Sequence, residues 1–226
     1  MEFKFNGVGN AANDKIQGIG TFQGGVYGAL SIDGVCTISG DIEAESLNIN
    51  GVCTCTGNAA AKKFDCDGVL TIEGNLRAGE ADVDGVVTVN GKKLEADKIK
   101  CDGVVTVLGE ISADVIEAKG HINAEAIVGD RITIKSYWSK WFPKFLFKVG
   151  KKGEGEPGVA GVGIGGFKLS VVDLIEGTTV ELRGVRAKSV NGHDVRIGKN
   201  CEIERVEATG ELFIDPKARV GEVKGA

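Results

Sequence analysis

The sequence is poor in proline and histidine, and it lacks long apolar runs. Three prolines among 226 residues exclude collagen and proline-rich linkers, and no window approaches the roughly 18 consecutive apolar residues of a membrane-spanning helix. Acidic residues outnumber basic ones by 32 to 27, which disfavours a nucleic-acid binder because such proteins need a basic surface. The chain opens without a basic and apolar secretion signal, so we expect a soluble, cytoplasmic protein.

Glycine, by contrast, is abundant and recurs at a regular interval. The chain has 35 glycines, about twice the ordinary frequency. A motif of glycine, valine or isoleucine, any residue, threonine, two further residues and glycine occurs six times, beginning at Gly18, Gly34, Gly51, Gly68, Gly85 and Gly103. The nearly constant spacing of these glycines indicates an internal repeat, because three fixed positions recur in register.

Each repeat contains three short segments in which apolar residues alternate with other residues. Alternation with period two predicts strands, since segments this short cannot be helices. Three strands repeated about every 17 residues and stacked on one another form an all-β parallel β-helix, or solenoid, with ladders of like side chains in its core. The predicted inward columns include Gly20, Cys36, Cys53, Leu70, Val87 and Val105, then Phe22, Ile38, Cys55, Ile72, Val89 and Val107, then Val26, Ile42, Ala59, Leu76, Leu94 and Ile111.

The cysteines follow the same columns. Five of them stand where other units have leucine, isoleucine, valine or phenylalanine, namely Cys36, Cys53, Cys55, Cys66 and Cys101. We therefore expect buried thiols and neither disulfides nor metal ligands. The threonines of the motif and the valines before them have the opposite parity and should point outward. Such a face reflects either plain β-propensity or a lateral contact surface.

Residues 136–152 interrupt the repeat with a different composition. They hold six aromatic residues and five lysines and no acidic residue, which suits contact with an anionic membrane surface; a hairpin packed on the solenoid is the alternative. The expected membrane or partner contacts are Trp138, Lys140, Trp141, Phe142, Lys144, Phe145 and Lys148. The glycine-rich stretch 153–166 lacks the ending of a phosphate-binding loop, so no nucleotide site is expected.

The apolar spacing resumes after the interruption. Val180, Ile197 and Ile214 follow one another at the interval of the repeat, and Val195 matches Leu212 at the same interval. We divide the chain into solenoid coils over 1–135, an insertion over 136–169 and a continuation of the solenoid over 170–226.

No catalytic site, cofactor site or metal site is expected. The two histidines, His121 and His193, each stand beside a glycine, a pattern that predicts surface turns, and neither has a nucleophile in a recognisable motif. Aspartates such as Asp33, Asp67 and Asp84 fall at the predicted corners, where turn formation explains them.

The glycine–valine–threonine units, the Gly40-Asp-Ile-Glu-Ala turn and the segment Val195-Arg-Ile-Gly-Lys-Asn-Cys-Glu-Ile resemble the bactofilins, bacterial polymer-forming cytoskeletal proteins, and most of all their Gram-positive branch. The resemblance implies a right-handed β-helix that polymerises end to end without nucleotide. It also implies a scaffold in envelope growth, cell shape or motility, with envelope or motility proteins as further partners. The chain departs from the family pattern in having more coils, no proline-rich tails and the aromatic insertion.

A solenoid also carries a physical reason to self-associate. Each end exposes unpaired backbone groups and core side chains unless something covers them. End-to-end contacts between copies are therefore expected at Phe3, Phe5 and Ile16 and at Leu212, Ile214 and Val220. The alternative function is a non-polymerising adaptor that docks on a membrane, at its cytoplasmic face, or on a partner through residues 137–149.

Overall fold

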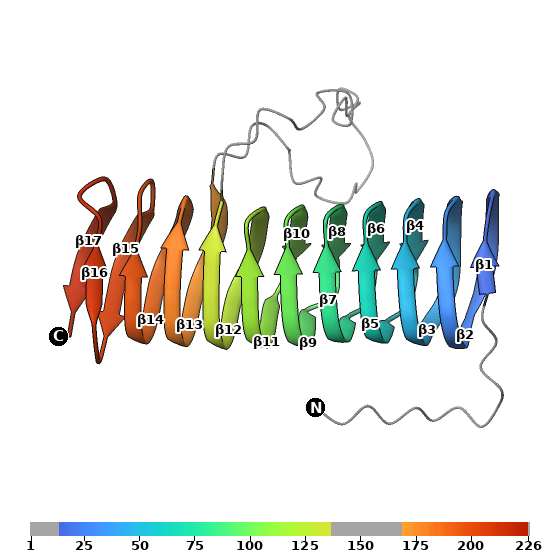
Figure 1. Ribbon diagram of the computed structural model, residues 1–226, viewed down its shortest axis with the longest axis horizontal. Coiled ribbons are helices and arrows are strands. Elements are labelled where there is room, and N and C mark those ends of the chain that lie inside the picture. The colour runs from blue at the N-terminus through green and yellow to red at the C-terminus, as the bar shows by residue number, and fades with distance from the viewer. Residues whose placement is uncertain (1–13, 137–168, 226) are drawn as a thin grey trace, which may run out of the picture.

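The computed structural model describes residues 14–136 and 169–225, and within these ranges every regular element is a strand. Figure 1 shows the strands stacked as successive coils along one long axis, from β1 at one end to β17 at the other. The strands are β1 (Asp14–Ile16), β2 (Ile19–Ile32), β3 (Val35–Ile49), β4 (Val52–Cys55), β5 (Ala59–Cys66), β6 (Val69–Ile72), β7 (Leu76–Val83), β8 (Val86–Val89), β9 (Lys93–Cys101), β10 (Val104–Val107), β11 (Glu110–Ala118), β12 (His121–Lys135), β13 (Ser170–Arg183), β14 (Val185–Ile197), β15 (Glu202–Ala208), β16 (Leu212–Ile214) and β17 (Arg219–Lys224).

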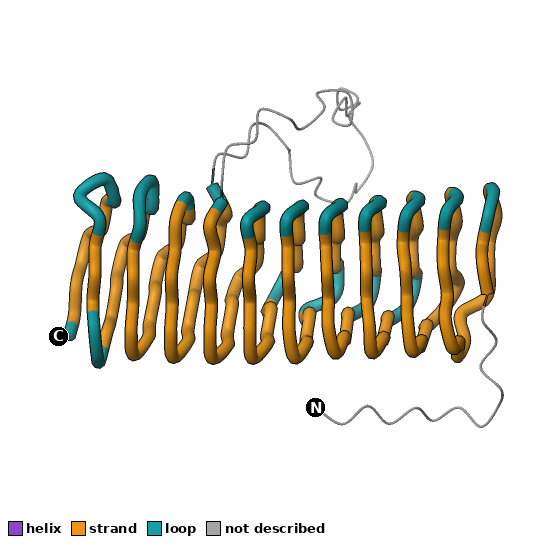
Figure 2. Tube along the Cα trace, viewed as in Figure 1, coloured by secondary structure: helices purple, strands orange, loops and turns teal. Residues whose placement is uncertain are grey.

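Each coil has three flat faces. In the coil of β4 and β5, face A is 52–55, face B is 59–61 and face C is 63–66, and pairing with the next coil is interrupted only at the corners. All inter-coil pairing is parallel, with Val52 beside Val69 and Ala59 beside Leu76. The predicted parallel solenoid, with about 17 residues and three short strands per coil, is confirmed (Figure 2).

The core consists of the predicted inward columns. Cys53, Leu70, Val87 and Val105 follow one another along the axis and are at most 1% exposed. All six cysteines are buried and free. One column assignment was wrong: Val26 pairs with the outward Glu43 and is 41% exposed, because a bulge between Gln23 and Gly25 shifts the register by one residue.

Stacked side-chain amides and carboxylates hold the turn between faces A and B. The Oδ1 atom of Asp41 accepts a hydrogen bond from the backbone N–H of Asn58 at 2.7 Å, and Oδ1 of Asn58 accepts one from Asn75 at 2.9 Å. Oδ1 of Asn75 accepts the N–H of Lys93 in turn. Each side chain therefore satisfies a backbone donor one coil further on, which keeps the turns of successive coils in register.

The solenoid continues directly across the insertion. β12 pairs with β13 in parallel, with Ile127 beside Ile175 and Ile132 beside Val180. The next coil is shorter than the usual one, so Val180 pairs with Val195. The regular spacing had wrongly predicted Ile197 as its partner. The coil is shorter because one residue is lost at the turn after face A and one at the corner between Leu182 and Val185.

Candidate functional site

The C-terminal end of the solenoid leaves core side chains uncovered. Leu212, Ile214, Val220 and Val223 continue inward columns whose preceding members are Val195, Ile197, Ile203 and Val206. Those preceding residues are at most 4% exposed, whereas Val223 is 47% exposed and the other three are partly buried. The last coil therefore presents four apolar side chains and the open backbone edges of β16 and β17.

At the N-terminal end the structure describes only part of the predicted contact. β1 covers face C of the first complete coil, where Ile16 pairs with Ile32 and is 7% exposed. Phe22 and Tyr27, on the other two faces of this coil, are only partly buried. The remaining predicted contacts, Phe3 and Phe5, lie outside the described residues.

Sequence reasoning assigned Leu212, Ile214 and Val220 to the C-terminal end and missed Val223. The signal was present, because Val223 stands one regular repeat after Val206 in an inward column. The structure brings these four residues together on one surface, since they belong to the same final turn of the solenoid.

The insertion leaves and rejoins the solenoid at one corner. Ser170 Oγ lies 2.6 Å from Ser136 Oγ, and Ser136 Oγ donates to the carbonyl of Gly120 at 3.0 Å. The backbone N–H of Ile122 donates to Ser170 Oγ, also at 3.0 Å. Both serines are buried, so this network satisfies polar groups where the chain departs. The seven predicted contact residues from Trp138 to Lys148 lie outside the described residues.

Face A of the N-terminal coils has the outward valine and threonine columns that parity predicted. Val35 and Val52 are 49% and 47% exposed. Cys36 and Cys53, the next residues in the chain, stand between the valine and threonine columns and are buried. Thr54 lies beside Thr71 and Thr71 beside Thr88. The face is therefore a regular, uncharged array of methyl and hydroxyl groups.

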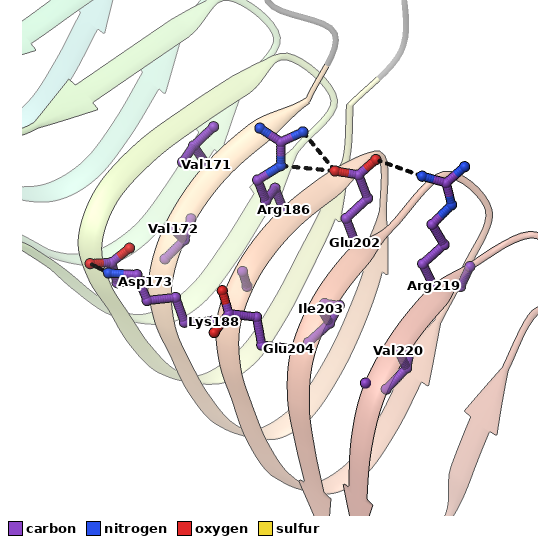
Figure 3. Close-up of a pocket in the computed structure, with 13 residues that line it drawn as sticks. Val171, Val172, Asp173, Arg186, Lys188, Glu202, Ile203, Glu204, Arg219 and Val220 are labelled. Carbon is purple, nitrogen blue, oxygen red and sulfur yellow. Dashed lines mark hydrogen bonds and ion pairs between the residues drawn. The ribbon is translucent and has the colours of Figure 1, made fainter.

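The C-terminal coils have a different, charged surface at the corner between faces A and B. A groove of about 810 Å³ runs here over β13, β14, β15 and β17. Figure 3 shows two rows of side chains along it. One row is Val171, Arg186, Glu202 and Arg219, and the other is Asp173, Lys188, Glu204 and Gly221.

Ion pairs link neighbouring coils within both rows. Arg186 donates through Nε and Nη2 to Oε2 of Glu202 at 2.9 and 2.6 Å, and Nη1 of Arg219 lies 3.7 Å from Oε1 of the same carboxylate. Nζ of Lys188 lies 2.7 Å from Oδ2 of Asp173. This hydrogen bond, with the nearby Glu204 carboxylate, holds the pKa of Lys188 above its ordinary value.

The cysteines are buried, whereas the two histidines differ in their exposure. Burial raises the pKa of Cys66 and of Cys101 to about 12, so these thiols stay protonated and are poor nucleophiles.

His193 is exposed, as predicted. The surface-turn prediction for His121 was wrong: this residue is 7% exposed, because the turn ends at Gly120 and His121 already lies in strand β12, paired with Val104. Across 14–136 and 169–225, no three His, Cys, Asp or Glu side chains are grouped to hold a metal.

The described part of the chain contains no helix that could cross a membrane. No family model matches the chain, and no solved structure matches it. A segment of 48 residues, 21% of this chain, is 48% identical to Uncharacterized protein YhbE of Bacillus subtilis strain 168. The match covers 20% of that protein, so the chain spans only a small part of this relative's length.

Proposed function

We propose that this protein is a non-enzymatic, self-assembling scaffold of the bactofilin kind, which polymerises end to end without nucleotide. Its cellular role would be to organise envelope, cell-shape or motility machinery from the cytoplasm. One observation carries the proposal: the final turn of the solenoid exposes Leu212, Ile214, Val220 and Val223 in columns that are otherwise buried.

A second copy is a suitable cover for this surface. Adding a coil of the same cross-section would bury the four side chains and pair the free backbone groups of β16 and β17. Each fully buried aliphatic side chain contributes about 1.5 to 3 kcal/mol. The contact would be mainly apolar, so nucleotide hydrolysis is not required to form it.

The test is assembly of the purified full-length chain in buffer without ATP or GTP, followed by negative-stain microscopy and sedimentation. We expect filaments from the parent protein. Ile214→Arg and Val223→Arg should both abolish them, because each introduces a charge into the apolar contact between ends.

A matched control is Val52→Arg. Val52 is 47% exposed, like Val223, but it points outward from face A between Val35 and Val69, inside the stack, so its substitution should leave filaments intact. Circular dichroism must show that all three variants are folded. A parent protein that sediments only as a monomer across the micromolar range, or end variants that still polymerise, would contradict the proposal.

The adaptor alternative depends on the composition of residues 137–149, which lie outside the described residues. It remains a prediction from the sequence and is tested separately by the lipid experiment in the Discussion.

A further inference from the structure

The charges along the C-terminal groove are arranged in bands, one band per coil. The β13 coil contributes Asp173, the β14 coil Arg186 and Lys188, the β15 coil Glu202 and Glu204, and the β17 coil Arg219. Along the axis the bands are therefore negative, doubly positive, doubly negative and positive (Figure 3). Read in the opposite direction, the same series has every sign reversed.

These groups are available to a partner. The exposed fractions of the Arg186, Lys188 and Arg219 side chains are 59%, 64% and 87%, and that of Glu202 is 37%. Their ion pairs within the chain lie at the surface, where such pairs are weak. A carboxylate accepts from more than one donor, so Glu202 can keep Arg186 of its own chain and bind a second cation.

We propose that this surface binds a second copy of the same chain, side by side and antiparallel. The two-fold axis passes between the β14 and β15 coils. The doubly positive band of Arg186 and Lys188 then faces Glu202 and Glu204 of the partner, and the reverse pairing occurs at the same time. The outer bands match as well, with Asp173 facing the β17 coil that carries Arg219. Such an isologous contact closes as a pair.

Other arrangements of two copies match less well. A parallel copy in register would set each band against one of its own sign, and close like charges repel. A parallel copy displaced by one coil would leave one band of each chain unmatched. The antiparallel pair matches all four bands.

The spacing also favours a second copy over a small ligand. Successive coils lie about 4.8 Å apart, and the signs alternate at that interval across four coils. Another copy carries the complementary alternation at the same interval, whereas a small anion or cation would satisfy one band and be repelled by the next. The contact is independent of the proposed end-to-end assembly, because it uses the side of the solenoid and not its ends.

The experiment uses the full-length chain with Ile214→Arg in every sample, so that lateral pairing is measured apart from contacts at the C-terminal end. Ile214 is on face C, away from the groove. Sedimentation velocity at low ionic strength should show a monomer–dimer equilibrium. One variant, Glu202→Lys/Glu204→Lys, makes both central bands positive, and a second, Arg186→Glu/Lys188→Glu, makes both negative. Each alone should lose dimerisation by about tenfold or more.

Mixing the two variants is the decisive measurement, because positive bands then face negative ones and dimers should return. Carrying all four substitutions in one chain again sets a positive central band against a negative one in the antiparallel pair, and should also restore dimers. Glu45→Lys, which breaks an exposed ion pair with Lys62 elsewhere on the solenoid, should have no effect. A monomeric Ile214→Arg protein at low salt, dimers that survive either double variant, or a mixture that stays monomeric would each overturn the proposal. If filaments of the parent protein are absent but these dimers form, only the end-to-end proposal fails.

Discussion

At the scale of single residues, a charged substitution should have opposite effects on folding at two adjacent positions of one strand. Val89 is fully buried in β8, while Thr88 beside it belongs to the outward threonine column. We expect Val89→Asp to prevent folding, because it places a charge between coils and removes the roughly 1.5 to 3 kcal/mol of an aliphatic side chain. Thr88→Asp should retain nearly all of the β-sheet circular dichroism. Equal loss of signal in both variants would contradict the parity.

The buried thiols predict an alkaline limit to stability. An unfolded thiol ionises near pH 9.0, whereas Cys66 and Cys101 keep their protons to about pH 12 in the folded chain. Unfolding between these values releases protons, so the free energy of unfolding is unaffected below pH 9.0 and falls as the pH rises towards 12. Urea midpoints at pH about 8 and about 10.5 measure this fall. It should be smaller for Cys66→Val/Cys101→Val, and an unchanged fall would exclude these thiols as the cause.

The residues that sequence reasoning assigned correctly are those repeated in several coils. Cys36 and Cys55 were predicted in the core because leucine, isoleucine and valine fill their columns elsewhere. Val26 could not be assigned, since the bulge after Gln23 has no repeated signature. His121 aligns with the outward Val104, so the repeat does not predict that it is 7% exposed.

At the scale of strands and turns, the corner glycines fix how closely coils approach. A Cβ on Gly68 would lie 2.0 Å from the carbonyl oxygen of Gly51 in the preceding coil. Gly68→Ala should therefore force the two coils apart and destabilise the fold by about 1 to 3 kcal/mol. Gly20→Ala is the control, because its Cβ would meet Phe22 at an ordinary 3.4 Å. Thermal unfolding compares the two, and equal melting temperatures would contradict the steric argument.

The insertion gives a prediction for lipid binding. If its aromatic residues and lysines bind an anionic bilayer, the protein should pellet with anionic but not neutral liposomes, with a blue shift in tryptophan fluorescence. Lys140→Glu, Lys144→Glu and Lys148→Glu together should abolish pelleting, since each lysine contributes about 1 kcal/mol near such a surface. Lys62→Glu/Lys63→Glu on the solenoid serves as the control. Absence of lipid-dependent pelleting would leave the packed-hairpin or partner-docking interpretations.

Strand lengths followed from the motif where the motif is intact. Short strands such as β4 and β6 coincide with the valine–threonine units. The shortened coil after the insertion could not be predicted, because Val180 and Ile197 happen to be separated by the usual interval and suggested a coil of the usual length. The groove depends on this shortened coil and on the register of the four coils that line it, so neither its rows nor their charge bands could be derived from spacing alone.

At the scale of the whole molecule, the two proposed contacts should respond differently to salt. The end contact is apolar and should persist as ionic strength rises, whereas the side contact depends on exposed charges that salt screens over about 10 Å at 0.1 M. We expect paired filaments at low salt and single filaments at high salt by negative-stain microscopy. Filaments that dissociate completely on adding salt would contradict an apolar end contact. Pairs that persist at about 1 M salt would contradict a charged side contact.

The corner where Ser136 meets Ser170, at which the insertion leaves and rejoins the solenoid, bears on how such a protein can diversify. Because Ser136 and Ser170 are in contact and β12 pairs directly with β13, the connecting segment can be exchanged without altering the register of any coil. The entropic cost of closing a loop there rises only slowly with its length. This corner is therefore a natural grafting point, where evolution or an engineer can attach a new cargo domain to an unchanged rod and display it at every subunit of an assembly.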